Sequence, residues 1–354
     1  MSFLGAVSKL GISVYAVSAI IPLSKSDAWW IRAFDFPRLQ LLFVGLVFAA
    51  LYLLVSGDRK AAKLGILSVL LVATCFDLYR VLPYSAIWPR ESRLATVASE
   101  PHELSLITVN VFQENKEPAK LLSLIEDHDP DIVFLLEVNE RWLKDLAPLD
   151  SAYTFQIEQP QENEYGLALY SRLPIENAEI RFLIEPEIPS VRAEVVLASG
   201  DRIEVFGLHP QPPRPQDGAT SERDAELVQV AKTVRNSSNP VIVMGDLNDV
   251  AWSHTTRLFR RISGLLDPRV GQESFPTFPV QCPLLRYPLD YVFHSSSLTI
   301  NSVERLDDIG SDHFPMYAKF TLESRKPEAE PKLDEGDMQE ADDTIRRAKE
   351  NDEK

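Results

Sequence analysis

Three long apolar stretches fill the first hundred residues, and shorter apolar runs follow them. They are Phe3–Leu23, Leu39–Gly57 and Leu64–Leu82. Each approaches the roughly 20 residues that a helix needs to cross the hydrocarbon core of a bilayer. The middle stretch has no charged residue and offers no polar face to water, which disfavours the alternative of a soluble helical bundle. We therefore predict that residues 1–100 form a membrane anchor with about three transmembrane helices.

Polar and aromatic residues at the ends of these stretches agree with this prediction. Asp77 and Arg80, near the end of the third stretch, are spaced i, i+3, so we expect them to neutralise each other on one helix face. Tryptophan and tyrosine residues lie at the segment ends, where an aromatic belt at the membrane interface is expected. These residues are Trp29, Trp30, Tyr79, Tyr84 and Trp88.

A short basic loop sets the expected orientation of the anchor. The segment Ser56–Lys63 contains Arg59, Lys60 and Lys63, and loops rich in lysine and arginine tend to remain in the cytoplasm. With this loop inside, the third span runs outward. We therefore expect a multi-pass membrane protein whose main body lies outside the cytoplasm.

Beyond Glu103 the pattern changes to short apolar runs that alternate with amphipathic segments. The run Ile132–Leu136 is continuously apolar, as expected for a strand that is buried on both faces. Helices are predicted at Ala119–His128 and Ser221–Val234. Strands are predicted at Leu104–Val111, Asp131–Val138, Gly166–Ser171, Val191–Leu197, Ile203–His209, Val241–Leu247, Leu289–His294 and Asp312–Leu322. The irregular order of strands and helices favours a layered α/β sandwich over a simple doubly wound sheet.

Charge is distributed unevenly along the chain. Residues 1–101 carry a net charge of +4, residues 102–322 carry −15 and residues 323–354 carry −5, which together give −16. A strongly acidic body opposes binding to duplex nucleic acid, because contacts with the phosphates usually need a basic surface. The tail 323–354 has few large apolar residues, so we predict that it is disordered, with room for a short helix near Ala341–Lys349. Cys75 and Cys282 lie in different regions and suggest no disulfide framework.

Polar residues of the types that serve in catalysis and metal binding lie at or just beyond the ends of the predicted strands. Taken singly, an asparagine or aspartate after a strand is a common turn residue. Taken together, they indicate a cleft along one edge of the sheets. They are Asn110, Glu137, His209, Asp246, Asn248, Asp312 and His313.

In their order along the chain, these residues resemble the distributed signature of the endonuclease/exonuclease/phosphatase superfamily. The matching positions are Asn110, Glu137, Tyr165–Pro174, His209, Gly245–Asn248, Leu289–Phe293 and Ser311–His313. The resemblance covers about Glu103–Leu322. It implies a catalytic domain in residues 101–322 with a four-layer α/β sandwich, in which two mixed sheets are packed together and flanked by helices.

The resemblance also implies a metal-dependent hydrolase of phosphate esters. Such a reaction needs an activated water, charge relief on the phosphate oxygens and help for the leaving oxygen. Mg²⁺, with Mn²⁺ as a substitute, prefers oxygen ligands. Glu137 is the leading candidate ligand, with Asn110 beside it and Asp312 as a further one.

The family pattern implies a role for each of the remaining residues. His313 would be the general base, with Asp290 as the carboxylate that orients it. Asp246 would position or polarise the water. Asn248 would bind the phosphoryl group, and His209 would donate to a non-bridging oxygen.

The substrate stays open at this point. Arg214 and Arg286 are the nearest candidate phosphate clamps, and the loop from Phe275 to Arg286 is short for gripping DNA. A phosphodiesterase or endonuclease is the leading hypothesis. The alternatives are a phosphodiesterase or phosphatase of lipid headgroups, acting on a phosphodiester or phosphomonoester, and a catalytically silent binding protein that retains the fold. No protein partner is implied.

Overall fold

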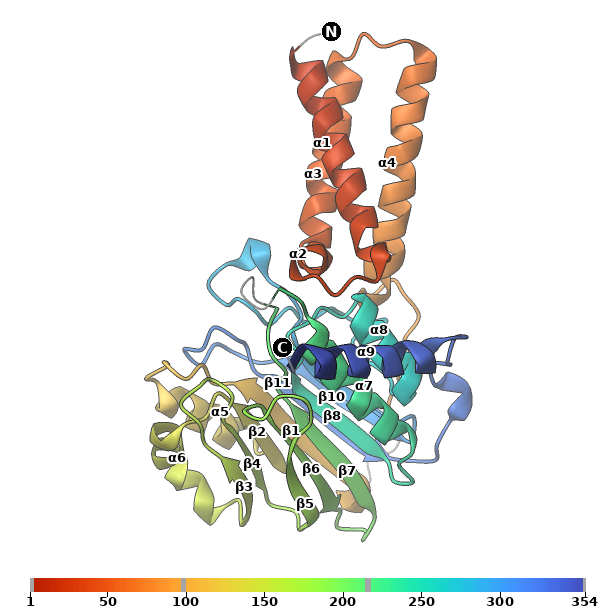
Figure 1. The fold of residues 1–354 in the computed structure, drawn as a ribbon. Coiled ribbons are helices and arrows are strands. Elements are labelled where there is room, and N and C mark those ends of the chain that lie inside the picture. Colours follow the sequence, from red (N-terminus) through yellow and green to blue (C-terminus); the bar gives the residue numbers. More distant parts are fainter. Residues whose placement is uncertain (1–2, 97–99, 214–217, 353–354) are drawn as a thin grey trace.

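In the computed structural model, which describes residues 3–96, 100–213 and 218–352, three long helices stand on one end of a layered body (Figure 1). These helices are α1 (Phe3–Ile20), α3 (Arg38–Val55) and α4 (Lys60–Val81), with the short helix α2 (Trp29–Arg32) between the first two. All three long helices are long and apolar enough to cross a membrane. Their outer surface is apolar as well: Phe43, Leu54 and Leu64 are exposed.

The buried charge at the foot of the bundle is paired differently from our prediction. Arg38 donates from Nη1 to Asp77 Oδ1 at 2.7 Å and from Nη2 to Asp35 Oδ1 at 2.6 Å. The Arg80 guanidinium instead lies over the Phe76 ring, 5.1 Å from its centroid. The predicted pairing of Asp77 with Arg80 is therefore wrong, because a buried arginine from the neighbouring helix reaches Asp77.

The body contains two mixed sheets. The larger has the strand order β10-β11-β1-β2-β4-β3 and the smaller the order β5-β6-β7-β8-β9. Within them, β1 pairs with β2 and β7 with β8 in parallel, whereas the other neighbouring strands are antiparallel. The strands of the larger sheet are β1 (Glu103–Asn110), β2 (Ile132–Leu136), β3 (Phe155–Gln159), β4 (Leu167–Ser171), β10 (Leu298–Arg305) and β11 (Met316–Leu322). Those of the smaller are β5 (Ile175–Phe182), β6 (Pro189–Val196), β7 (Arg202–Leu208), β8 (Val241–Asp246) and β9 (Asp290–His294).

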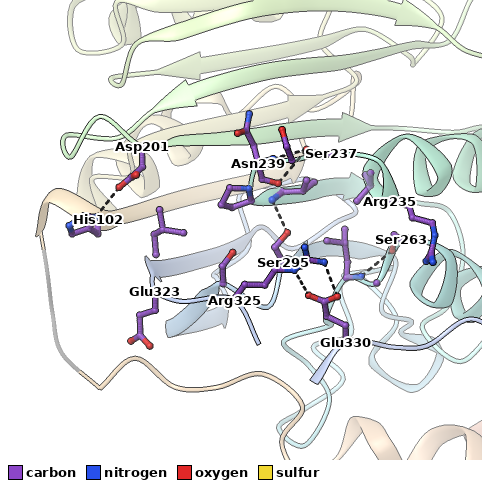
Figure 2. A pocket seen from close by; sticks show the side chains of 18 residues that line it. His102, Asp201, Arg235, Ser237, Asn239, Ser263, Ser295, Glu323, Arg325 and Glu330 are labelled. Carbon is purple, nitrogen blue, oxygen red and sulfur yellow. Dashed lines mark hydrogen bonds and ion pairs between the residues drawn. The ribbon is translucent and has the colours of Figure 1, made fainter. Parts of the chain in front are cut away.

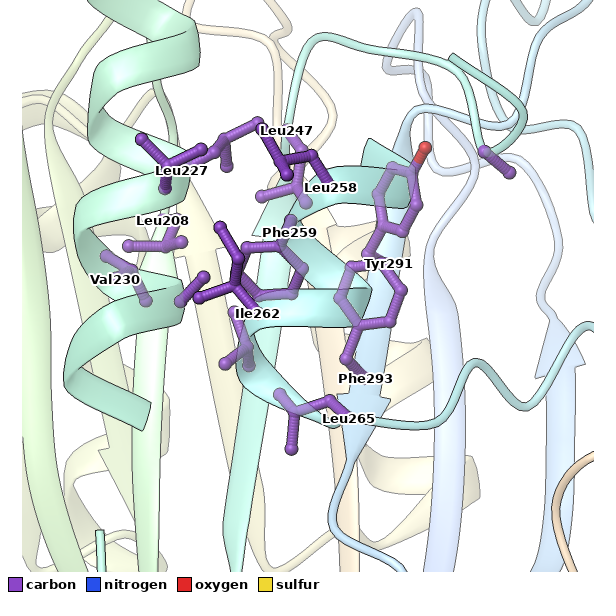
Figure 3. Packing of buried hydrophobic residues seen from close by; sticks show 14 of the residues in the cluster. Leu208, Leu227, Val230, Leu247, Leu258, Phe259, Ile262, Leu265, Tyr291 and Phe293 are labelled. Atoms are coloured by element: carbon purple, nitrogen blue, oxygen red, sulfur yellow. The ribbon is translucent and has the colours of Figure 1, made fainter. Parts of the chain in front are cut away.

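Alternate residues of the central strands face different layers, because side chains point to opposite faces of a strand in turn. In β8, Ile242 and Met244 pack between the two sheets, whereas Val241 and Val243 pack toward the outer helices. Figure 3 shows the outer cluster beneath α7 (Ser221–Arg235) and α8 (His254–Ser263). Helices α5 (Pro118–His128) and α6 (Glu140–Leu146) cover the other sheet. The predicted four-layer α/β sandwich is therefore confirmed.

The acidic tail follows its prediction only in part. Residues Asp337–Asp352 form helix α9, which packs against α7. Ala341 and Ala348 are fully buried on its inner side. Arg261 donates from Nε to Asp337 Oδ2 at 2.8 Å. The short helix expected near Ala341–Lys349 lies within α9. The segment is nevertheless longer and more ordered than predicted, because basic residues of the body pair with its acidic side chains and small apolar residues pack below them.

Candidate active site

The ends of the two parallel strand pairs meet at one edge of the sandwich. Asn110 ends β1 and Glu137 follows β2 in the larger sheet, while His209 follows β7 and Asp246 ends β8 in the smaller one. A cavity of about 160 Å³ lies between them. Its lining is formed by Asn110, Glu137, Glu164, Tyr165, His209, Pro212, Asp246, Asn248, Phe278, Leu289, Asp312 and His313.

On the larger sheet, Glu137 is held in a fixed orientation. Asn110 donates from Nδ2 to Glu137 Oε1 at 2.8 Å, and the Gln113 N–H donates to Oε2 at 3.0 Å. Asn110 Oδ1 accepts from the Phe112 N–H. Glu137 has a φ of 61°, a conformation that costs energy for a residue with a side chain and that is common at functional sites. The local backbone therefore turns this carboxylate into the cavity.

On the smaller sheet, the Gly-Asp-Leu-Asn segment makes a sharp turn after β8. A side chain at Gly245, whose φ is 130°, would overlap the Leu208 carbonyl oxygen of β7. Asp246 Oδ1 accepts from the Asn248 N–H at 2.9 Å, and Asn248 donates from Nδ2 to the Pro210 carbonyl at 3.0 Å. Asn248 has a φ of 51°. The turn thus joins the ends of β7 and β8 and directs both polar side chains to the cavity.

His313 reaches the same cavity from the segment before β11. Ser311 donates from Oγ to the Asn110 carbonyl at 2.7 Å and accepts from the His313 N–H at 3.0 Å. The His313 Nδ1 lies 2.8 Å from Asp290 Oδ2, and its Nε2 lies 3.5 Å from Asp246 Oδ2. With Nδ1 committed to Asp290, Nε2 is the ring nitrogen available for proton transfer.

The buried carboxylates dominate the electrostatics of this end. Burial alone lowers the pKa of His313, but Asp290 and Asp246 outweigh it and raise that pKa to about 10. Burial raises the pKa of Asp246, and it also raises the pKa of Asp312. For Glu137, burial raises the pKa more than the hydrogen bonds from Gln113 and Asn110 lower it. The cavity therefore has an excess of buried negative charge that a cation would relieve.

Two sets of residues have the chemistry to hold a metal. Donor atoms of Asp246, Asp290 and His313 lie within 4.8 Å of one another. In that set, however, His313 and Asp290 already share a hydrogen bond, which is the arrangement of an oriented base. The oxygen atoms of Glu137, Asn110 and Asp312 suit a hard cation better.

His209 faces Asp246 from β7. Its Nε2 lies 3.9 Å from Asp246 Oδ2, and its side chain is 5% exposed. The Tyr165 ring packs 5.5 Å from the imidazole, measured between centroids. Tyr165 begins the motif of Tyr165–Pro174 but had no role in the sequence interpretation. Phe278, whose ring centroid lies 4.7 Å from that of His313, was also missed.

The two arginines expected to bind phosphate have different outcomes. Arg214 lies outside the described residues. Arg286 donates from Nη2 to the Val280 carbonyl at 2.6 Å, and its guanidinium stacks on Phe314 at 4.8 Å. It is absent from the described lining of the cavity. These contacts hold Arg286 within its own loop, and its role in binding phosphate stays a prediction.

A larger cavity of about 460 Å³ lies at the opposite end of the sandwich, where β7 and β8 begin (Figure 2). Several of its polar groups make hydrogen bonds with other protein groups. Arg325 donates from Nε to Glu330 Oε1 at 2.8 Å, and Ser295 Oγ accepts from the Val241 N–H at 2.8 Å. None of the predicted site residues lines this cavity among the parts of the chain that the structure describes.

Proteins of known sequence or structure resemble this chain over the catalytic body. The sequence is 29% identical over 198 residues to the uncharacterized protein YbhP of Escherichia coli (strain K12), covering 51% of this chain and 72% of that protein. The structure of D. rerio TDP2 complexed with a single strand DNA product has a TM-score of 0.53 and 20% identity, covering 62% of this chain and 99% of that one. The human Nocturnin catalytic domain with bound sulfate anion has a TM-score of 0.52 and 19% identity, covering 64% and 96%. At these identities the structural likeness shows the fold alone.

The family assignment rests on a separate match. The sequence profile described as the Endonuclease/Exonuclease/phosphatase family matches residues 107–313. This segment begins within β1, ends at His313 and is more than half of the chain. The chain therefore belongs to the Endonuclease/Exonuclease/phosphatase family.

Proposed function

We propose that this protein is a membrane-anchored, Mg²⁺-dependent phosphodiesterase. One observation carries the proposal: a single cavity combines a fixed carboxylate, Glu137, with a buried histidine, His313, oriented by Asp290. Hydrolysis of a phosphodiester needs both an electrophilic partner for the phosphate and a base for the water. The zebrafish TDP2 structure contains a single strand DNA product, which agrees with a phosphodiester substrate.

The residues at Glu137 fit a divalent cation. The carboxylate is partly buried and accepts hydrogen bonds from two neutral donors, Asn110 Nδ2 and the Gln113 N–H. The charge of Asp312 raises the pKa of Glu137 further. Glu137 would hold the metal, with Asn110 and Asp312 beside it. The metal, when bound, would polarise a phosphate oxygen and neutralise charge that develops in the transition state.

The protein's own side chains account for the proton and for the phosphate orientation. Asp290 holds His313 so that Nε2 faces the attacking water. A cation bound at Glu137 would offset the carboxylates that raise the pKa of His313 to about 10, and the deprotonated Nε2 would then take a proton from the water. Asp246, 3.5 Å from that nitrogen, orients the water. Asn248 and His209, on the same edge of the smaller sheet, donate to phosphate oxygens.

A test uses the purified full-length chain and bis-p-nitrophenyl phosphate, a soluble phosphodiester. With Mg²⁺ present, wild type should release p-nitrophenol, and His313→Ala should not. A DNA and RNA panel with the same pair of proteins extends the comparison to natural phosphodiesters. Equal release from both proteins, or none from wild type on any substrate, would reject the proposal.

We further propose that the body lies outside the cytoplasm. Arg59 precedes α4, and Lys60 and Lys63 lie in the first turn of that helix. The connection from α3 to α4 is at the end of the bundle remote from the body (Figure 1). The positive-inside tendency then favours a cytoplasmic loop and an external body. Alkaline phosphatase, which is active only outside the cytoplasm, should work when fused after Arg93 and fail when fused within Ser56–Lys63. The reverse pattern would place the body inside.

A further inference from the structure

The helix bundle stands on one end of the sandwich (Figure 1), and two contacts identify this as the end that holds the candidate active site. Trp252, in the loop after β8, donates from Nε1 to the Asp35 carbonyl at 2.7 Å. The Thr220 N–H, before α7, donates to the Asp27 carbonyl at 2.7 Å. Trp252 lies in the same loop as the Gly-Asp-Leu-Asn turn, four residues after Asn248, and Thr220 belongs to the connection that leaves β7 at His209. The anchor and the catalytic cavity therefore share one end of the body.

Aromatic rings connect the cavity to the foot of the bundle. Phe278 lines the cavity and packs 4.7 Å from His313 between ring centroids. Its N–H donates to the Tyr287 carbonyl at 3.0 Å. The Tyr287 ring packs edge-on against Phe36, 5.5 Å away. Phe36 lies just before α3 begins at Arg38, so a few contacts connect the candidate base to an apolar helix.

The first turn of α3 marks the level of the membrane surface on the body side. Helix α3 has 18 residues, which gives a length of about 27 Å, close to the roughly 30 Å of a hydrocarbon core. A helix of that length must therefore begin near one surface. Trp30 and Tyr79, at the same end of the bundle, are 50% and 65% exposed, as expected for aromatic residues at the interface.

An exposed leucine pair lies at this level. Gln40, in the first turn of α3, donates from Nε2 to the Leu284 carbonyl at 2.8 Å. Leu284 is 83% exposed and Leu285 is 47% exposed. Figure 1 shows their light-blue loop rising beside α2. Apolar side chains at this depth are stabilised by entering the bilayer interface, and the loop that carries them leads back to Tyr287 and the cavity.

Charge favours a lipid over a nucleic acid as the substrate. The body, residues 102–322, carries a net charge of −15, and nucleic acid needs a basic surface to offset its phosphates. A lipid headgroup is delivered by the bilayer itself, so it needs no such surface.

We propose, resting on the function proposed above, that the substrate is the phosphodiester of a lipid headgroup in the bilayer that holds the anchor. The leucine pair Leu284 and Leu285 enters the interface beside the cavity. Water adds to the phosphorus, one phosphorus–oxygen ester bond breaks, and a proton passes to the leaving oxygen. Each turnover yields one phosphomonoester and one alcohol.

The test compares the same phosphodiesters with and without their acyl chains. Full-length protein with Mg²⁺ receives vesicles of phosphatidylethanolamine, phosphatidylglycerol and phosphatidylinositol, or the deacylated glycerophosphodiesters, or a single-stranded oligonucleotide. Phosphorus NMR follows the phosphomonoester. We expect kcat/KM for vesicle lipid to exceed that for the deacylated compounds by at least about tenfold, the scale of burying one leucine-sized apolar group.

Faster or equal hydrolysis of the deacylated compounds or of the oligonucleotide overturns this inference and leaves the phosphodiesterase intact. Failure to hydrolyse every probe overturns both.

Variants of Leu284 and Leu285 test whether this pair causes the preference for vesicle lipid. Leu284→Glu combined with Leu285→Glu should lower the ratio of the vesicle rate to the deacylated rate by about tenfold, because a carboxylate resists entry into the interface. Leu94→Glu is the matched control: Leu94 is 49% exposed and pairs with Ile300 at the opposite end of the sandwich. An unchanged ratio in the folded double variant overturns the inference. If the double variant also loses its deacylated rate, Leu284→Ser with Leu285→Ser provides the same comparison.

Discussion

Each end of the sandwich carries a histidine beside an aspartate. At the bundle end, His313 Nδ1 lies 2.8 Å from Asp290 Oδ2, with side chains that are 5% and 0% exposed. At the opposite end, His102 Nδ1 lies 3.1 Å from Asp201 Oδ2, with side chains that are 43% and 47% exposed. The contact distances are similar, so the difference lies in burial and in neighbours. The buried pair faces Asp246 as well, whereas Asp201 also accepts from the Ser199 hydroxyl.

Cavity volume alone would place the active site at the end of the sandwich opposite His313. The cavity at His102 and Asp201 has a volume of about 460 Å³ and the one at His313 about 160 Å³. In the larger cavity Arg325 pairs with Glu330, so their charges offset each other. Solvent screens the exposed pair of His102 and Asp201 in the same cavity. At the smaller cavity Glu137 and Asp246 in the lining, and Asp290 buried behind His313, add charge of one sign. Unbalanced buried charge at strand ends, rather than volume, therefore distinguishes the candidate active site.

Metal removal should produce the largest effect. Exhaustive treatment with EDTA should abolish phosphodiester hydrolysis, and Mg²⁺ or Mn²⁺ should restore it, because the carboxylates at Glu137 and Asp312 need a hard cation. Hydrolysis of bis-p-nitrophenyl phosphate before and after addition of each metal measures this. Full activity after chelation would remove the proposed role of Glu137.

Removing the base or its acidic neighbour should be nearly as damaging. His313→Ala and Asp246→Ala should each reduce kcat by at least about a hundredfold, the usual scale for a lost general base or electrostatic group. Steady-state kinetics on the soluble phosphodiester measure the loss, and circular dichroism checks that each variant is folded. Turnover near that of wild type in a folded variant would contradict the assignment.

A subtler change should separate metal binding from proton transfer. Glu137→Gln keeps the side-chain shape but removes the charge, so we expect the Mg²⁺ concentration for half-maximal activity to rise at least about tenfold. His313→Ala should leave that concentration nearly unchanged while lowering the maximum rate. A titration of activity against Mg²⁺ distinguishes the two. The same Mg²⁺ requirement in Glu137→Gln and wild type would exclude Glu137 as a ligand.

The strands that carry the candidate site residues can be predicted from the sequence for a physical reason. The central strands β1, β2, β7 and β8 are buried on both faces. β2 and β8 are continuous apolar runs up to their ends, so a polar residue that ends or follows such a run, such as Asp246 or Glu137, is conspicuous. Edge strands lack that signal. In β5 the residues are partly or fully exposed. Its charged residues interrupt the apolar pattern from which a strand would be predicted.

The local sequence pattern does not predict contacts between residues that are far apart in the chain. The partner of Asp77 is Arg38, on another helix, although Arg80 has the right local spacing. Arg286 looked like a free phosphate ligand because the Val280 carbonyl and the Phe314 ring that engage it are identified only by the fold. Helix α9 is stabilised by pairs such as Arg261 with Asp337, which are far apart in the chain.

Burial alone should not confer catalysis, and Glu226 of α7 tests this. It is 3% exposed, and among the described residues its Oε1 has no hydrogen-bond partner. Burial, reinforced by Glu185, raises its pKa to about 8. Since the folded-state pKa lies above the unfolded value of about 4.3, the folded state retains its proton and loses stability as the pH rises from there toward 8.

We therefore expect Glu226→Gln to stabilise the protein near neutral pH, on the order of 3 kcal/mol, and to have little effect at about pH 5. Turnover should remain close to wild type. Thermal unfolding at both pH values, together with phosphodiester kinetics, measures this. A pH-independent change in stability would show that the carboxyl does not titrate as described.

The smallest effect should come from the histidine–aspartate pair at the opposite end. His102→Ala and Asp201→Ala are matched in chemistry to His313→Ala and Asp246→Ala, but they remove an exposed pair that solvent screens. Such a pair contributes about 0–1 kcal/mol to stability, and it lies beside the ends of β7 and β8 that are remote from the catalytic cavity. We expect kcat and the Mg²⁺ requirement to stay within about twofold of wild type, well below the hundredfold loss expected of a removed base. A loss comparable to that of His313→Ala would mean that the larger cavity takes part in the reaction, and the distinction between the two ends would fail.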